Sequence, residues 1–221
     1  KRKNNLRSFF SCIVLCIKNR FFSKKKFGNF LFINTHINVQ HFNSKSKSQS
    51  LMIRGKAIEE SLRFYLSNKN NINLKQKDII DYAFDYFYLR TSKLSKSIIK
   101  KHSLSIPHLI KSGISFFDNV TTKKSYLLDY SLNNGEIDIY PDFTITNIEY
   151  DGKKINRCLF ELKIVNSDNF KTDHKYKKQA FQYAYWSKLP VLLLYLVFEE
   201  KKSRNSIEFK SFPQVVSFFS K

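Results

Sequence analysis

Glycine, proline and cysteine are scarce in this sequence of 221 residues. Five glycines and four prolines exclude collagen-like and proline-rich linker proteins. The three cysteines, Cys12, Cys16 and Cys158, provide neither a disulfide framework nor a paired zinc motif. No apolar run approaches the ~20 residues that span a bilayer, so we expect no stable membrane association. Because 42% of the residues are hydrophobic and 16% aromatic, a fully disordered chain is also excluded.

Acidic residues are absent from the first fifty positions, which contain 11 Lys and Arg. A leader that lacks acids and is rich in Lys, Arg, Ser and Asn is typical of targeting segments for endosymbiotic organelles. The apolar run at residues 9–17 suits the two-part leader of a complex plastid such as an apicoplast. A mitochondrial presequence and a disordered basic tail are the alternatives. We therefore assign residues 1–50 to a leader or tail and residues 51–221 to one folded domain.

The formal net charge is +21, of which +10 belongs to residues 51–221. Such an excess favours polyanionic partners, because each phosphate that Lys or Arg neutralises releases counterions. The chain is also rich in Lys, Asn, Ile, Phe and Tyr, which the codons of an AT-rich genome supply. Charge alone therefore leaves both explanations open, and a site is needed to decide between them.

Hydrophobic periodicity predicts helices in the first half of the domain and again after residue 172. Apolar residues Ile58, Leu62, Tyr65 and Leu66 define one face of the first helix. The expected helices cover residues 51–66, 79–89, one or two segments within 93–112 broken before Pro107, and a helix from Thr172 or Asp173 to about 186.

The second half of the sequence predicts strands. Residues 191–198 are continuously apolar, which indicates a strand buried on both faces. The expected strands are 125–132, 137–150, 155–165, 191–198 and a short edge strand at 207–209, followed by a short helix at 213–219. The predicted fold class is α/β, with a mixed central sheet made of a three-strand meander, a helix and one or two further strands, flanked by helices.

The dipeptide Asp151-Gly152 between two apolar strands predicts a two-residue type I′ hairpin turn. In such a hairpin, residues whose numbers sum to about 303 lie opposite each other, which places Asp142 opposite Glu161. Asp138 would lie about four residues out of register. It remains the fallback, because a β-bulge would shift the pairing.

Glu161 and Lys163 are two apart on a strand, so both side chains project from one face. The facing carboxylates Asp142 and Glu161 repel each other unless a proton or a cation intervenes. An all-oxygen ligand set favours Mg²⁺ or Mn²⁺, with a substrate phosphate completing the coordination. This combination matches hydrolysis of a phosphodiester, in which Lys163 orients the attacking water or neutralises developing charge.

Pro141-Asp142 followed by Glu161-Leu162-Lys163 resembles the PD-(D/E)xK nuclease superfamily. Two further segments resemble the branch that contains RecB nuclease domains, lambda-type exonuclease and the mitochondrial genome maintenance exonuclease. They are RGKAIE (residues 54–59) and QAFQY (residues 179–183), the latter matching a Q-x-x-x-Y helix. The resemblance covers about residues 54–197 and implies a restriction-endonuclease-like core, whereas the helical insert at 68–124 matches no part of the family.

The resemblance also implies roles for particular residues. Glu59 shares the apolar face of its helix and would join Asp142 and Glu161 as a metal ligand, with the Leu162 carbonyl as a possible extra ligand. Lys163 would be catalytic. The expected DNA-binding residues are Arg54, Lys177, Lys178, Gln179 and Tyr183.

These observations predict a Mg²⁺- or Mn²⁺-dependent deoxyribonuclease, with an exonuclease favoured. Its expected substrate is single-stranded DNA or duplex ends, in organelle DNA replication, repair or maintenance. A restriction-like endonuclease or junction resolvase on the same fold is the alternative within the class. A non-catalytic, basic nucleic-acid-binding protein is the alternative from another class.

Overall fold

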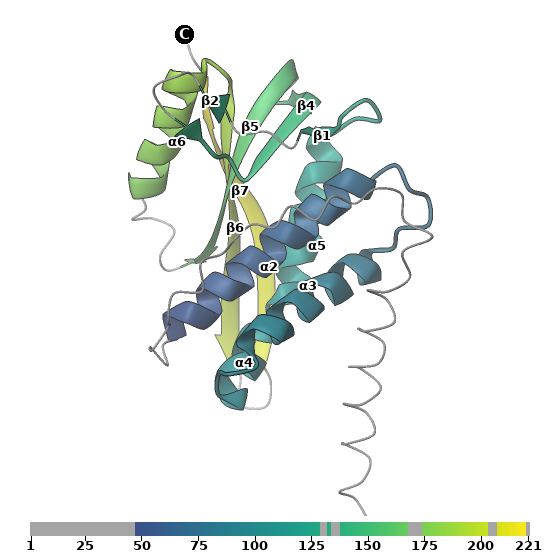
Figure 1. The fold of residues 1–221 in the computed structure, drawn as a ribbon, viewed down its shortest axis with the longest axis vertical. Helices are drawn as coiled ribbons and strands as arrows, with labels where there is room; N and C mark the ends of the chain where they lie inside the picture. The colour runs from purple at the N-terminus through teal and green to yellow at the C-terminus, as the bar shows by residue number, and fades with distance from the viewer. Residues whose placement is uncertain (1–46, 129–131, 134–137, 168–173, 203–206, 220–221) are drawn as a thin grey trace, which may run out of the picture. The chain divides into compact units, whose positions relative to one another are not determined.

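A computed structural model describes most of the expected domain (Figure 1). The described residues are 47–128, 132–133, 138–167, 174–202 and 207–219. They belong to one compact unit, Ser44–Lys221. The expected leader therefore lies outside the described residues, apart from positions 47–50, which form the start of a helix.

Helices form in the segments where the apolar residues repeat with helical spacing. In chain order they are α2 (Lys47–Asn68), α3 (Gln76–Thr91), α4 (Lys96–Ser103), α5 (Ile106–Val120) and α6 (His174–Ser187). The predicted apolar face of α2 is confirmed, since Ile58 and Leu62 are fully buried. No helix within the described ranges is long and apolar enough to cross a membrane.

The strands form one five-stranded mixed sheet and a separate two-stranded pair. The main sheet has the order β1-β4-β5-β6-β7, formed by β1 (Leu127–Leu128), β4 (Phe143–Tyr150), β5 (Lys153–Asn166), β6 (Val191–Lys202) and β7 (Ile207–Phe218). The second pair is β2 (Leu132–Asn133) with β3 (Asp138–Ile139). All pairs are antiparallel except β5 with β6, which are parallel and are connected through α6.

Helices cover both faces of the main sheet, α6 on one face and α2 to α5 on the other (Figure 1). Even-numbered residues of β6, such as Leu192 and Leu194, pack in the core beneath α2 to α5. Odd-numbered ones, such as Leu193 and Tyr195, pack beneath α6. Burial of both faces explains the unbroken apolar sequence of this strand and confirms the α/β prediction.

The β4–β5 hairpin has the register that its turn sequence predicts. Asp151 and Gly152 both have positive φ, at 52° and 68°, as a type I′ turn requires. Phe143 lies opposite Phe160, and every other pair of this ladder keeps the same register. The pairing therefore directs position 142 towards position 161 without a shift between the strands.

Two expectations about the strands are wrong. Residues 213–219 do not form a helix, because β7 continues to Phe218 and pairs with β6 along its whole length. Pro213 is tolerated there because β7 is the edge strand of the main sheet, where a missing N–H leaves no pairing donor unsatisfied. The strand expected at 137–150 is also interrupted, since residues 140–142 separate β3 from β4.

Candidate active site

Asp142 and Glu161 come together where β4 begins beside β5. Glu161 lies within β5 and is 3% exposed. Asp142 precedes the first residue of β4, and its Oδ2 accepts a hydrogen bond of 2.7 Å from the backbone N–H of Leu162. This bond fixes the Asp142 carboxylate against the strand that carries Glu161, as the hairpin register predicts.

Lys163 contacts both carboxylates. Its Nζ donates a hydrogen bond to Glu161 Oε1 and lies 3.9 Å from Asp142 Oδ2. Burial lowers the pKa of Lys163, but the charges of Glu161 and Asp142 outweigh burial, so the net pKa is raised. Lys163 is therefore a cation at neutral pH, held between two carboxylates.

Glu161 is the most perturbed acid of the cluster. Burial and the charge of Asp142 raise its pKa to about 7, although Lys163 acts in the opposite direction. Its second oxygen, Oε2, is buried and has no hydrogen-bond partner among the described residues. A buried carboxylate oxygen without a partner is costly, and a proton or a bound cation would remove that cost.

Glu59 reaches the same region from α2. Its Oε1 lies 2.5 Å from Lys56 Nζ and 3.8 Å from Arg63 Nη2, and Arg63 also donates a hydrogen bond to the backbone carbonyl of Asp142. Burial, followed by the charge of Asp142, raises the pKa of Glu59. The expectation that Glu59 faces inward is confirmed, since its side chain is 14% exposed against 27% for Glu60.

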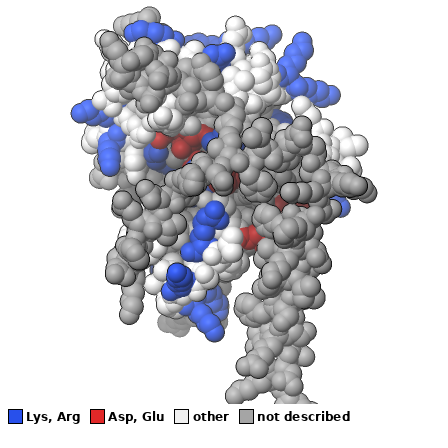
Figure 2. Space-filling model, in the orientation of Figure 1, with Lys and Arg blue, Asp and Glu red and all other residues white. Residues whose placement is uncertain are grey.

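The three carboxylates do not form a ready-made set of metal ligands. Among the described side chains, no group of three or more His, Cys, Asp and Glu residues is placed to hold a metal ion. Glu59 is paired with Lys56 instead, while Asp142 and Glu161 share Lys163. In Figure 2, acidic atoms lie beside basic ones in one part of the visible face, and smaller acidic areas appear elsewhere on it.

Helix α6 adds aromatic and amide groups to the cluster. Gln179 Nε2 donates a hydrogen bond of 3.0 Å to Tyr183 Oη. Burial and the charges of Glu161 and Asp142 raise the pKa of Tyr183, although the bond from Gln179 lowers it. Lys163 Nζ lies 5.0 Å from the centre of the Tyr176 ring, within the range of a cation–π contact. Tyr183 is therefore near enough for the charges of the carboxylates to act on it, and Gln179 is bonded to Tyr183.

Arg54 does not lie where the sequence places it. It is 4% exposed, donates a hydrogen bond of 2.9 Å to Ser105 Oγ and lies 4.5 Å from the centre of the Phe198 ring. Burial lowers its pKa to about 10. Its position inside the helical layer corrects the expectation of a surface that touches DNA, because the guanidinium is already enclosed by protein.

The remaining candidates divide between surface and core. Lys177 and Lys178 are exposed on α6, where contact with phosphates is sterically open. Leu162 is buried and presents its N–H to Asp142, so a ligand role for its carbonyl stays a prediction. Asp138 belongs to β3, which pairs with β2 and not with β5. The unshifted β4–β5 ladder therefore favours Asp142 over this fallback.

Sequence reasoning missed the groups that hold the carboxylates and the lysine in place. Tyr176 precedes Gln179 by three residues and Tyr183 by seven, so helical spacing would have placed it on their face. Lys56 and Arg63 flank Glu59 by three and four residues, which is the spacing of helical ion pairs. The bond from Arg63 to the carbonyl of Asp142 had no sequence signal, because 79 residues separate the two.

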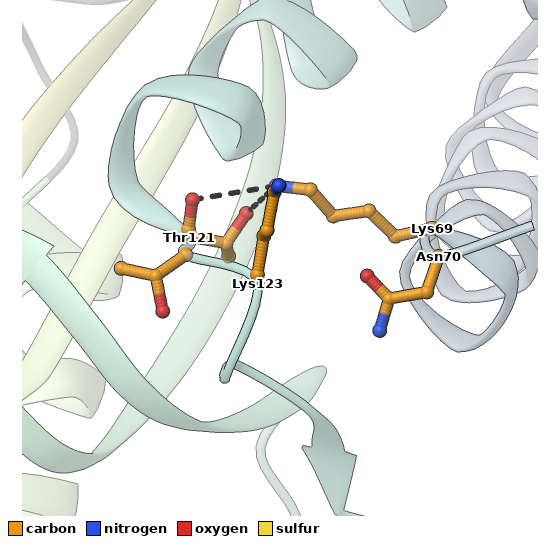
Figure 3. A pocket seen from close by; sticks show the side chains of 5 residues that line it. Lys69, Asn70, Thr121 and Lys123 are labelled. Carbon is orange, nitrogen blue, oxygen red and sulfur yellow. Dashed lines mark hydrogen bonds between the residues drawn. The ribbon is translucent and has the colours of Figure 1, made fainter. Parts of the chain in front are cut away.

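A separate pocket lies at the C-terminal ends of α2 and α5 (Figure 3). Its lining residues are Lys69, Asn70, Thr121, Thr122 and Lys123. Lys69 Nζ donates to the Thr121 carbonyl at 3.4 Å and to its hydroxyl, and lies 3.6 Å from Asp118. Lys69 lies ten residues after Glu59, about 15 Å along the helix axis, so this pocket is distinct from the carboxylate cluster.

Comparison with known proteins leaves the family open. No protein-family model matches the chain, and no curated protein is similar to it. A solved structure described as "Crystal structure of SSO0001" is 21% identical, over 73% of this chain and 77% of that chain, with a TM-score of 0.25. A similarity at that TM-score carries no argument about fold or activity.

Proposed function

We propose that this protein is a divalent-metal-dependent DNA nuclease of the PD-(D/E)xK type, related to the RecB and lambda-exonuclease branch. The observation that carries the proposal is the shared contact of Lys163 with Asp142 and Glu161, beside a hydrogen bond from the Leu162 N–H to Asp142. The antiparallel strands β1, β4 and β5, followed by α6 and by β6 parallel to β5, support the proposal of a restriction-endonuclease-like core, although α3 to α5 and the β2–β3 pair interrupt the order of its elements.

The residues fit a hard divalent cation. Asp142 and Glu161 supply oxygen ligands, the orphaned Oε2 of Glu161 would gain a partner, and Glu59 would contribute directly or through water. When bound, Mg²⁺ or Mn²⁺ polarises the phosphate and lowers the pKa of a water molecule. Because the metal stabilises ionised carboxylates, we expect Glu161 to lose its proton when the ion binds.

The side chains of the protein would stabilise charge and position the substrate. The Lys163 ammonium is kept charged by its carboxylate neighbours and is held near the Tyr176 ring. It can therefore offset the negative charge that develops on a phosphate in the transition state. Gln179 and Tyr183, which are hydrogen-bonded to each other on α6, would position the substrate backbone. An exonuclease is the favoured form, and an organelle role rests on the leader sequence alone.

The test is degradation of end-labelled linear and closed-circular single-stranded DNA, in Mg²⁺ and in EDTA. We expect Mg²⁺-dependent loss of the linear substrate only, and a decrease of at least 100-fold in Lys163→Ala, which removes charge stabilisation in the transition state. Lys154→Ala is the matched control, because Lys154 is exposed on the same strand. Its activity should remain within twofold of wild type.

Other outcomes of this experiment lead to different conclusions. Cleavage of the circular substrate would replace the exonuclease with a restriction-like endonuclease or junction resolvase. DNA binding without cleavage in Mg²⁺ or Mn²⁺ would favour a non-catalytic nucleic-acid-binding protein. Equal activity in wild type and Lys163→Ala, with both sensitive to EDTA, would show that the assigned site is not the catalytic one.

A further inference from the structure

The outer face of α6 exposes two large aromatic side chains. Phe181 is 58% exposed and Tyr185 is 60% exposed. Lys178, Phe181 and Tyr185 follow each other at intervals of three and four residues, so they lie along one face, and Lys188 follows directly after the last residue of α6. An adjacent face of α6 packs against the sheet, since its residues Ala180 and Ala184 are buried. We call these four residues the α6 outer stripe.

The charge around the stripe suits an anionic partner. The 14 residues of α6 include three lysines and no Asp or Glu. Lys178 and Lys188 are both exposed, and Lys188 Nζ lies 4.4 Å from the centre of the Tyr185 ring. By contrast, α3 exposes Tyr82 and Tyr88 on a helix that carries three aspartates. Exposed aromatic residues combined with cations and no acids are therefore a property of α6 and not of every helix.

We propose that the α6 outer stripe binds single-stranded DNA, with bases stacked on Phe181 and Tyr185 and phosphates near Lys178 and Lys188. Aromatic rings combined with Lys or Arg are the usual means of holding unpaired bases, because every base has a stackable face. A duplex hides those faces, so the stripe discriminates in favour of single strands. A protein partner would also cover an apolar stripe, but it would have no need for the surrounding positive charge.

The location of the stripe connects it to the proposed catalytic site. On the opposite face of the same helix, the ring centre of Tyr176 lies 5.0 Å from Lys163 Nζ. A strand that stacks on the outer face of α6 is therefore held by the element that borders the carboxylates. The inference extends the proposed nuclease function, but it requires no cleavage. Binding in EDTA tests the inference alone, and the degradation assay tests the nuclease alone.

The experiment is fluorescence anisotropy of the full chain with a labelled poly-dT oligonucleotide in EDTA. Stacking is typically worth ~1–3 kcal/mol for each base, so Phe181→Ala and Tyr185→Ala should each weaken binding about tenfold. Phe181→Tyr and Tyr185→Phe keep the rings and should bind within twofold of wild type. Tyr88→Ala, which removes an exposed ring from α3, is the matched control and should have no effect.

An abasic oligonucleotide separates stacking from simple charge attraction. We expect it to bind weakly and to be insensitive to the two alanine substitutions, because it offers phosphates without bases. The proposal is overturned if Phe181→Ala/Tyr185→Ala binds poly-dT like wild type, or loses the same affinity for the abasic strand. It is also overturned if the double variant instead abolishes self-association measured by sedimentation, which would make the stripe a contact between copies of this chain.

Discussion

Glu161 is the residue at which function and stability conflict. Burial and the charge of Asp142 disfavour the ionised form of Glu161. Its Oε2 has no hydrogen-bond partner among the described residues. Such a residue weakens the fold unless a ligand compensates for it. A proton, or the cation of the proposed function, would remove this cost.

This conflict predicts a pH dependence of stability. The pKa of Glu161 is about 7 in the folded protein, above the ordinary value of 4.5 in the unfolded chain. As the pH rises from 5 to 8, the unfolded chain releases this proton first, so Glu161 progressively favours unfolding. Glu161→Gln lacks this penalty. Its stability relative to wild type should therefore increase between pH 5 and pH 8, by up to about 3 kcal/mol.

Urea unfolding in EDTA at the two pH values measures that difference. Glu149→Gln is the matched control, because Glu149 is an exposed acid on the adjacent strand. It should show the same stability relative to wild type at both pH values. If the difference in free energy of unfolding between Glu161→Gln and wild type were the same at both pH values, Glu161 would ionise without cost in the folded protein.

At the scale of single elements, α2 and α5 pack closely at a glycine. A Cβ added at Gly113 of α5 would lie 2.7 Å from Leu62 Cδ1, and Leu62 is fully buried. A Cβ added at Gly55 of α2 would meet nothing within 4 Å. Both glycines lie in helix interiors, so the same substitution has the same intrinsic effect on helix formation at the two sites.

We therefore expect Gly55→Ala and Gly113→Ala to change stability in opposite directions. Gly55→Ala should raise the free energy of unfolding by about 0.5–1 kcal/mol through helix propensity. Gly113→Ala should lower it by about 1 kcal/mol, because Leu62 must leave its rotamer in a packed core. Chemical denaturation of both variants measures the two changes. Equal stabilisation would show that the α2–α5 contact is loose.

The same elements show which features the sequence determines and which it leaves open. Asp151-Gly152 defines a turn of fixed length, and the turn length sets the register that brings Asp142 to Glu161. The β7 strand was partly missed because Pro213 normally ends regular structure, and only its edge position makes it acceptable. Arg54 was misplaced because it contacts Ser105 at the start of α5 and Phe198 of β6, and a local motif carries no information about those contacts.

On the scale of the whole molecule, the net charge of +21 acts on stability and on binding in opposite ways. Mutual repulsion among exposed lysines destabilises the compact state, and salt screens this repulsion. Salt also weakens contacts with a polyanion, because counterions released into a more concentrated salt solution gain less entropy. A chain that keeps this charge despite its cost to folding is consistent with an anionic partner that offsets the repulsion when bound.

The free protein should therefore become more stable as salt is added, whereas the DNA binding that we propose should weaken. Raising NaCl from about 20 to 300 mM, which shortens the screening length severalfold, should raise Tm by about 2–4 °C for each kcal/mol of repulsion removed. The triple variant Lys93→Glu/Lys96→Glu/Lys124→Glu changes three exposed lysines and reduces the net charge by six. Its Tm should rise less with salt than that of wild type. Identical salt responses would mean that the positive charges are too far apart or too well solvated to repel, and the excess of lysine would then reflect composition alone.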